Sequence, residues 1–287
     1  MSPPFRHVAV LGTGLIGGSF ALALRRAFPE MVVTGWDRTA VLDRAVRLGA
    51  IHQAAPDLAS ACRSAELVYV ALPVEEAIRR LPEIVAAVSA EALTTDAAST
   101  KSAICEAAAR FFQPPKLFVG GHPIAGRELA GVEHADADLF RGAPYVLIGE
   151  SGRPVEPDER VTRLVAAIEA IGARPVWLDA AEHDRLFAFL SHLPQLTAVA
   201  LAETVLEGAG DSAATLAGRG LVDSLRLAGS PYDLWAGICR TSPSLDEALA
   251  RLIRALERIR TGLAGEHDLA RDFDRANRLY KTLRRIE

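Results

Sequence analysis

A glycine-rich turn near the N-terminus sets the strongest limit on how this chain can fold. The apolar run 7–11 leads into Gly12-Thr13-Gly14-Leu15-Ile16-Gly17-Gly18, and residues with helical apolar spacing follow through Leu24. A strand, a glycine turn and a helix in this order let the backbone approach a pyrophosphate at the helix N-terminus. The turn therefore predicts a dinucleotide-binding unit.

The end of the next strand supports this interpretation. Residues 31–36 form an apolar run that ends at Asp37, at the spacing expected for a carboxylate that holds the adenosine ribose hydroxyls. Such a carboxylate repels the extra phosphate of NADP, so the sequence favours NAD. Two alternatives stay open, because Asp37 can be a solvated strand-end carboxylate and Arg38 can meet a ribose phosphate. The predicted cofactor-binding residues are Gly12, Gly14, Leu15, Ile16, Gly17, Asp37 and Arg38.

Strands and helices then alternate as they do in parallel sheets. Helices are expected over 39–48, 74–88, 101–112 and 158–171, and strands over 67–72, 92–95, 117–119, 145–148 and 174–178. The α/β part of the chain is expected to finish with the last two strands. This predicts an α/β, Rossmann-type dinucleotide-binding domain over residues 1–179.

Strand signals vanish after residue 180. Apolar residues recur with helical spacing over 182–190, 195–205, 211–228, 245–263 and 269–285. An all-α helical dimerisation domain over 180–287 is therefore expected, because these apolar faces are well suited to bury against a second copy. A monomeric bundle packed on the sheet domain is the alternative.

Composition narrows the class of partner. The 287 residues are 50% hydrophobic and 24% charged, with a net charge of −4, which is typical of a globular protein without a basic surface for nucleic acid or anionic membrane. The three cysteines are far apart and no histidine motif has metal-ligand spacing, so neither a disulfide nor a metal site is expected. No signal segment or membrane span is expected either. We expect a cytoplasmic protein whose partner is a small molecule.

One histidine lies where such a sheet binds its ligands. His122 follows the apolar run 117–119, between Gly121 and Pro123, which free and restrict the backbone around it. Asp96 and Ser99 follow the preceding strand, and the carboxyl ends of parallel strands share one edge. We therefore expect Asp96, Ser99 and His122 to converge. The alternatives are that His122 is a turn histidine bonded to the backbone and that Ser99 or Thr100 caps a helix.

The helical half carries three further places for chemistry. Glu182-His183-Asp184 is the first, and Ser191-His192-Leu193-Pro194 is the second. The third is Asp223 with Arg226, three apart on a predicted helix, where the carboxylate can orient a guanidinium that binds a substrate carboxylate. His192 can instead be a satisfied core histidine before a helix break at Pro194, and the third place can be a surface pair of little energetic value.

Taken together, these motifs resemble the prephenate/arogenate dehydrogenase family of tyrosine biosynthesis. The resemblance runs nearly end to end. It rests on residues 12–19, 96–101, 121–126 and 191–194, and on the Asp223/Arg226 pair followed by 228–230 and 234–235.

The resemblance implies NAD-dependent oxidative decarboxylation of prephenate to 4-hydroxyphenylpyruvate. It implies that His122 accepts the proton of the ring hydroxyl, that Ser99 orients this hydroxyl and that His192 lines the pocket from the helical domain. It further implies that Arg226, steadied by Asp223, anchors a substrate carboxylate, and that Glu128 is an acidic pocket residue that gates or discriminates substrates.

Two departures from the family leave the substrate open. Arg127 stands where a small Thr or Ser is common, and Val222 stands where many members have Arg. Arogenate dehydrogenase and dual-specificity cyclohexadienyl dehydrogenase are therefore alternatives, and a non-catalytic NAD-responsive binding protein is a more remote one. A β-hydroxyacid or ketopantoate-type dehydrogenase is disfavoured, because the only lysine in the helical half is Lys281.

Overall fold

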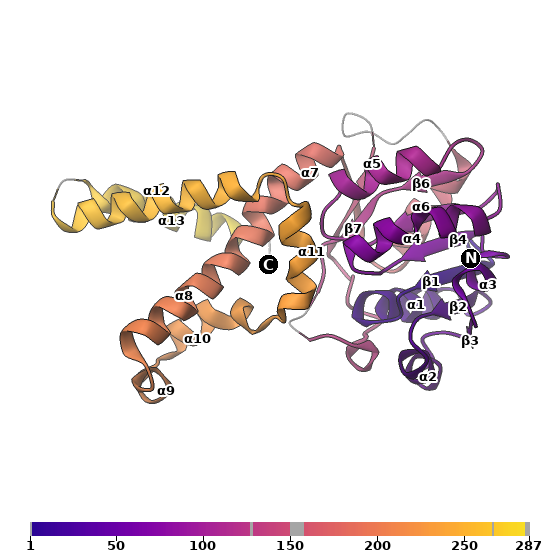
Figure 1. The fold of residues 1–287 in the computed structure, drawn as a ribbon, viewed down its shortest axis with the longest axis horizontal. Coiled ribbons are helices and arrows are strands. Elements are labelled where there is room, and N and C mark those ends of the chain that lie inside the picture. The colour runs from indigo at the N-terminus through magenta and orange to yellow at the C-terminus, as the bar shows by residue number, and fades with distance from the viewer. Residues whose placement is uncertain (1, 127–128, 150–157, 266, 285–287) are drawn as a thin grey trace. The chain divides into compact units, whose positions relative to one another are not determined.

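A computed structural model describes residues 2–126, 129–149, 158–265 and 267–284. The chain divides into two compact units, Met1–Pro243 and Ser244–Glu287, and each is described by itself. Figure 1 shows the fold and labels most of its helices and strands. The domain boundary at residue 180 stays a prediction, since this division separates only the last two helices from the rest.

A six-stranded parallel sheet forms the centre of the first unit. Its strand order is β3-β2-β1-β4-β5-β6, the order of doubly wound dinucleotide-binding folds. The strands are β1 (His7–Leu11), β2 (Val32–Trp36), β3 (Gln53–Ala54), β4 (Leu67–Val70), β5 (Leu93–Asp96) and β6 (Leu117–Val119). The crossover helices are α1 (Leu15–Ala27), α2 (Thr39–Arg47), α3 (Leu58–Cys62), α4 (Val74–Ala87) and α5 (Ser102–Phe111). The short elements β3 and α3 were not predicted, because two exposed residues in β3 give no apolar pattern.

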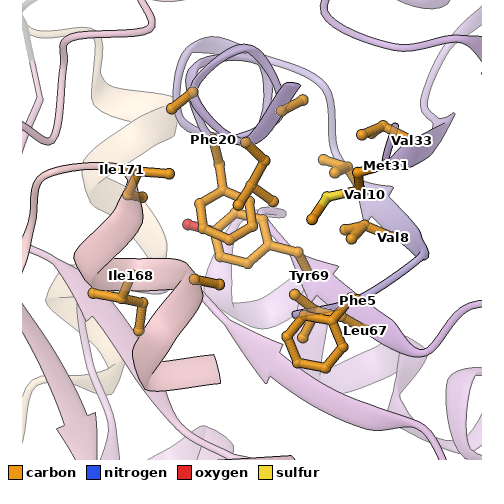
Figure 2. Close-up of a cluster of buried hydrophobic side chains, with 14 of the residues drawn as sticks. Phe5, Val8, Val10, Phe20, Met31, Val33, Leu67, Tyr69, Ile168 and Ile171 are labelled. Atoms are coloured by element: carbon orange, nitrogen blue, oxygen red, sulfur yellow. The ribbon is translucent and has the colours of Figure 1, made fainter. Parts of the chain in front are cut away.

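Helices cover both faces of this sheet, which explains why β4 and, from Val8 onward, β1 are continuously apolar. Along β1, Val8 and Val10 point into one buried cluster, and Ala9 and Leu11 point into the other. In the first cluster the rings of Phe20 and Tyr69 stack with centroids 3.8 Å apart (Figure 2). Buried apolar side chains thus pack on both faces of the sheet.

The last three strands form a second sheet. Its order is β7 (Gly121–Pro123), β8 (Pro144–Ile148) and β9 (Arg174–Leu178), with α6 (Glu159–Ala170) between the last two. The two strands predicted at 145–148 and 174–178 are present and pair in parallel, but they belong to this separate sheet, in which the unpredicted strand β7 runs antiparallel to β8. The chain leaves the first sheet at Gly121, where a Cβ atom would lie 2.5 Å from the Asp96 carbonyl oxygen.

A long helical run begins at Ala180. It consists of α7 (Ala180–Phe187), a π-helical turn η2 (Ala188–His192) and α8 (Leu193–Ala209). The helix break expected at Pro194 does not occur, because this proline lies at the start of α8, where a missing N–H costs little. The π-helical turn η2 joins α7 to α8, so the helical run continues without a break.

By length and composition alone, the run Ala180–Ala209 is apolar enough to cross a membrane, contrary to the sequence-based expectation. Its residues His183, Asp184 and His192 are nevertheless buried and hydrogen-bonded within the protein. These contacts fasten the first part of the run to the rest of the protein, while 28% of its most apolar stretch is buried.

Shorter helices complete the first unit. They are η1 (Val132–His134), α9 (Ser212–Leu216), α10 (Arg219–Leu225), η3 (Arg226–Gly229) and α11 (Tyr232–Thr241). The single helix expected over 211–228 is interrupted at Ala217 and Gly218, and α11 was not predicted. The second unit holds α12 (Leu245–Leu263) and α13 (Leu269–Leu283), which expose apolar side chains such as Leu256, Leu263, Phe273 and Leu279.

Two glycines of the turn differ in the space that surrounds them, and this difference can be tested. A Cβ atom on Gly17 would lie 1.9 Å from the Gly12 carbonyl oxygen, whereas one on Gly14 meets nothing within 4 Å. We expect Gly17→Ala to lower the free energy of unfolding in urea by about 2 kcal/mol, because the turn must shift. Gly14→Ala is the matched control and should change it by less than about 0.5 kcal/mol. Equal stability of the two variants would contradict the close-approach role of Gly17.

Candidate active site

The glycine turn at the end of β1 can accept a dinucleotide. Gly12 has φ +91°, and a Cβ atom there would lie 2.4 Å from the Ala71 carbonyl oxygen. Leu15 and Ile16 form the first turn of α1, whose N-cap residue Gly14 supplies no side-chain hydrogen bond. The first N–H groups of the helix and the open side of Gly14 therefore suit a pyrophosphate.

Asp37 is held in place at the end of β2. Its Oδ2 accepts the Thr13 N–H at 2.7 Å, and its Oδ1 accepts the Arg38 N–H at 2.7 Å. The strand-end role considered for Asp37 is therefore present. It is compatible with ribose binding, because a carboxylate has about four acceptor sites. The Arg38 guanidinium is exposed, with Nε 4.0 Å from Asp37 Oδ1.

A buried ion pair fastens the loop after β5 to the start of β7. Asp96 accepts the N–H groups of Ala98 at 2.9 Å and of Gly121 at 3.0 Å. The ammonium of Lys101 pairs with Asp96 and donates to the Gly121 carbonyl at 2.7 Å. Both side chains are fully buried. Since a buried charge is costly without its partner, this pair fixes the residue that precedes His122.

His122 belongs to a hydrogen-bonded series of three side chains. Its Nδ1 lies 2.8 Å from Nε2 of His183, and Nδ1 of His183 lies 2.8 Å from Oδ1 of Asp184. His122 is 8% exposed, and the other two are fully buried. The Phe187 ring packs against both imidazoles, with centroids 5.0 Å from His122 and 4.4 Å from His183.

The same carboxylate caps α5 from a distance. Asp184 accepts the N–H groups of Lys101 at 2.7 Å and of Ser102 at 2.8 Å. The N-cap residue of α5 is Lys101, and no side chain at that position caps the helix. The alternative that Ser99 or Thr100 is an ordinary N-cap is therefore wrong. The Thr100 hydroxyl instead bonds to the Thr241 hydroxyl of α11 at 2.6 Å.

Burial controls the protonation of this series. It lowers the pKa of His122 well below the usual range, and His183, Lys101 and His192 lower it further by charge repulsion. Burial also lowers the pKa of His183, although Asp184 opposes that shift. For Asp184, burial raises the pKa, but hydrogen bonds from His183, Ser102 and Lys101 outweigh it and the net shift is downward. Near neutral pH the imidazoles are therefore neutral and Asp184 is ionised.

His192 lies close to this series, since it is one of the groups that lower the pKa of His122. Its Nδ1 is 2.9 Å from the Ser242 hydroxyl, and its ring meets Trp235 edge to face at 6.1 Å. Burial lowers its pKa to about 4, while Asp184 and the nearby Ser99 backbone raise it. His192 therefore lies near both the Ser99 backbone and His122, whose pKa it helps to lower.

Three buried polar atoms around His192 lack a hydrogen-bond partner of good geometry in the described part of the chain. They are Nε2 of His192, Oε1 of Gln195 and Nε1 of Trp235. Buried polar atoms are rarely left so, and a group of them indicates a place for a polar ligand or for water. The alternative that His192 is a satisfied core histidine therefore leaves its Nε2 unexplained.

Asp223 and Arg226 lie at the junction of α10 and η3. Both are exposed, Asp223 in the last turn of α10 and Arg226 at the first residue of η3. Gln195 donates to the Leu227 carbonyl at 2.9 Å, which ties η3 to α8 one turn after His192. Their substrate role stays a prediction. Arg127 and Glu128 lie outside the described residues.

Several residues of this site were not given a role from the sequence. His183 and Asp184 were a candidate place for chemistry, and their adjacency at a helix start is the signal that marks them. Lys101 lies in the segment 96–101, but its bond to the Gly121 carbonyl and the bond of Ser242 to His192 join residues 20 and 50 positions apart. No local pattern marks these two contacts.

The fold and the site define an oxidoreductase with a Rossmann-type domain followed by a helical domain. The family described as "Prephenate dehydrogenase, nucleotide-binding domain" matches residues 20–176. The family described as "Prephenate dehydrogenase, dimerization domain" matches residues 179–284. The chain belongs to the prephenate dehydrogenase family, which confirms the resemblance and the fold class.

Relatives in this family differ in their named substrates. A prephenate dehydrogenase of Lactococcus lactis is 32% identical over 84% of this chain, which spans 66% of that protein's length. A cyclohexadienyl dehydrogenase of Zymomonas mobilis is 30% identical over 91% of this chain and 90% of its own length.

Solved structures of the family have the same fold. Prephenate dehydrogenase from Aquifex aeolicus, in complex with hydroxyphenyl propionate and NAD+, is 25% identical with a TM-score of 0.85, covering 97% of each chain. Arogenate dehydrogenase from Synechocystis is 28% identical with a TM-score of 0.76, covering 96% of this chain and 99% of its own.

The depressed pKa of His192 predicts acid sensitivity of the fold. Its folded pKa of about 4 lies below the ordinary value near 6.5, so its contribution to stability is complete above pH 6.5 and is lost as the pH falls toward 4. Between pH 7 and pH 5 this amounts to about 2 kcal/mol of unfolding free energy. We expect His192→Asn to show a correspondingly smaller loss over this range in urea titrations. Parallel pH profiles for the two proteins would contradict the assignment.

Proposed function

We propose that this protein catalyses the NAD-dependent oxidative decarboxylation of prephenate to 4-hydroxyphenylpyruvate. The observation that carries the proposal is His122, a neutral buried imidazole fixed beside the carboxyl end of β5 by His183 and Asp184. NAD is the cofactor. It is supported by the family's nucleotide-binding domain, by the NAD+ in the Aquifex aeolicus structure and by the fit of the glycine turn and Asp37.

The residues of the site match the steps of this reaction. When bound, NAD supplies the nicotinamide ring that accepts a hydride from the ring carbon bearing the hydroxyl. His122 accepts the hydroxyl proton, and Ser99 orients that hydroxyl. The ring carboxylate then leaves as carbon dioxide, the electron pair of the broken C–C bond makes the ring an aromatic phenolate, and His122 returns the proton to the phenolate oxygen. His192 lines the opposite side of the substrate.

Substrate anchoring is assigned to the helical half. Arg226, steadied by Asp223, would hold a substrate carboxylate through its planar fork, and Glu128 and Arg127 would bear on the choice of substrate. The same half provides the predicted homodimer interface, which the match to the family's dimerization domain supports. We also propose that the protein is cytoplasmic, as expected from the sequence.

Arogenate is the alternative substrate. It carries an amino acid where prephenate carries a keto acid, and the arogenate and cyclohexadienyl dehydrogenases among the relatives favour it as a second candidate. A non-catalytic NAD-responsive protein is disfavoured, because cofactor sensing requires neither His122 nor the buried residues that fix it.

A direct assay tests the proposal. We expect NADH to form with prephenate at a kcat/KM at least about tenfold above that with arogenate. The reason is that the cationic Arg226 repels the ammonium group of the amino acid but not the uncharged keto group of the keto acid. The reverse preference would move the assignment to arogenate dehydrogenase, and no turnover with either would refute the proposed function.

The same assay needs a control at the proposed base. His122→Asn keeps a donor toward His183 but removes the proton acceptor, so kcat should fall about 10²- to 10⁴-fold while NAD affinity is unchanged. His267→Asn, which alters a histidine bonded to Asp272 in the second unit, is the matched variant and should retain turnover.

Arg226→Ala tests the carboxylate anchor. Loss of a charged hydrogen-bonding fork should raise KM for prephenate about 10- to 100-fold with little change in kcat, measured by steady-state kinetics. Arg219→Ala, at the first residue of α10, is the matched control. If Arg226→Ala instead lowers thermal stability and leaves KM unchanged, the pair with Asp223 is a surface contact only.

A further inference from the structure

Two adjacent side chains of α7 and one of β7 form a hydrogen-bonded series that ends at His122. We propose that His183 and Asp184 are positioning residues that fix the tautomer of His122, with the proton on Nδ1 and the lone pair on Nε2. This inference rests on the proposed role of His122 as proton acceptor. It names the nitrogen that accepts and the groups that select it.

The assignment starts at Asp184, whose surroundings require an ionised carboxylate. Its two oxygens accept the N–H groups of Lys101 and Ser102 at 2.7 and 2.8 Å, at the N-terminus of the ten-residue helix α5. Helix N-termini favour negative charge. An ionised carboxylate only accepts hydrogen bonds, so Nδ1 of His183, 2.8 Å from Oδ1, must carry a proton.

Because the His183 ring is neutral, its tautomer determines the tautomer of His122. A neutral ring has one N–H, so a proton on Nδ1 of His183 leaves a lone pair on its Nε2. That lone pair faces Nδ1 of His122 at 2.8 Å. Two lone pairs facing each other would repel, so His122 must donate from Nδ1. Its own lone pair is then on Nε2.

Packing holds the imidazole rings of His122 and His183 in this orientation. Phe187 stacks on His183 with 23° between the ring planes and also contacts His122. His183 and Asp184 are fully buried, which excludes water as a competing partner. The low pKa of His183, caused by burial, keeps that ring neutral and so keeps the argument valid near neutral pH.

The arrangement also serves the protonated state of His122. Once Nε2 has taken a proton, Nδ1–H still donates to His183, whose own Nδ1–H donates to the carboxylate of Asp184. The negative charge at the end of the series stabilises the imidazolium without a change of geometry. A ring in the other tautomer would present an N–H to the substrate hydroxyl and could not accept its proton.

The tautomer can be measured without substrate. In protein labelled with ¹⁵N-histidine, we expect the His122 ring signals, identified by their loss in His122→Asn, to show protonated Nδ1 and unprotonated Nε2. Protonated Nε2 in the wild-type protein would overturn the proposal. Because this spectrum needs neither turnover nor a variant of His183, it tests the tautomer even if prephenate is not the substrate or a His183 variant does not fold.

Variants of His183 test its consequence for the reaction. In His183→Phe nothing accepts from His122 Nδ1, so we expect mixed tautomers and a kcat at least about 10²-fold lower, with KM for NAD unchanged. In His183→Gln the amide oxygen can accept, which should preserve the tautomer and keep kcat within about tenfold of wild type. Arg185→Gln, an exposed change on the same helix, is the matched control. A His183→Phe protein that keeps the wild-type tautomer and the kcat of Arg185→Gln would overturn the proposal.

Discussion

The carboxylate of Asp184 is the interaction on which the rest of the site depends. It accepts two backbone N–H groups at the start of α5 and one imidazole N–H from its own helix α7. One buried anion thus joins the loop after β5, the start of the long helical run and, through His183, the short strand that carries His122. Because hydrogen bonds to a charged acceptor are stronger and more directional than neutral ones, this junction sets the geometry of the site.

Much of the fold could be predicted because its signals are local. The glycine turn, the apolar strands and the aspartate after β2 all lie within one βαβ unit, and the structure has the predicted doubly wound sheet. The strand β9 and the helix α12 have the predicted bounds. Such elements follow from residues whose conformational needs do not depend on distant partners.

The remaining features depend on contacts between distant residues. Gly121 turns the chain into a second sheet because it approaches the Asp96 backbone, and no pattern around Gly121 records that approach. Pro194 looks like a helix break but begins α8 after a π turn. Of the candidate site, Asp96, Ser99 and His122 were predicted to converge, and the resemblance implied His192 as a pocket residue. The bonds of Lys101 to Gly121 and of Ser242 to His192 join residues 20 and 50 positions apart, so no local pattern marks them. Sequence spacing cannot show which of several buried polar groups face each other.

The buried charges explain why this site is so strongly determined. Lys101 and Asp96 are fully buried, and so is Asp184. Each would destabilise the fold without its partner, and each partner is a group that also places a residue of the site. Lys101 bonds to the residue before His122 through its side chain and to Asp184 through its backbone N–H. A folded chain in which these charges are satisfied therefore has His122 in one position, so stability and the geometry needed for proton transfer are enforced by the same contacts.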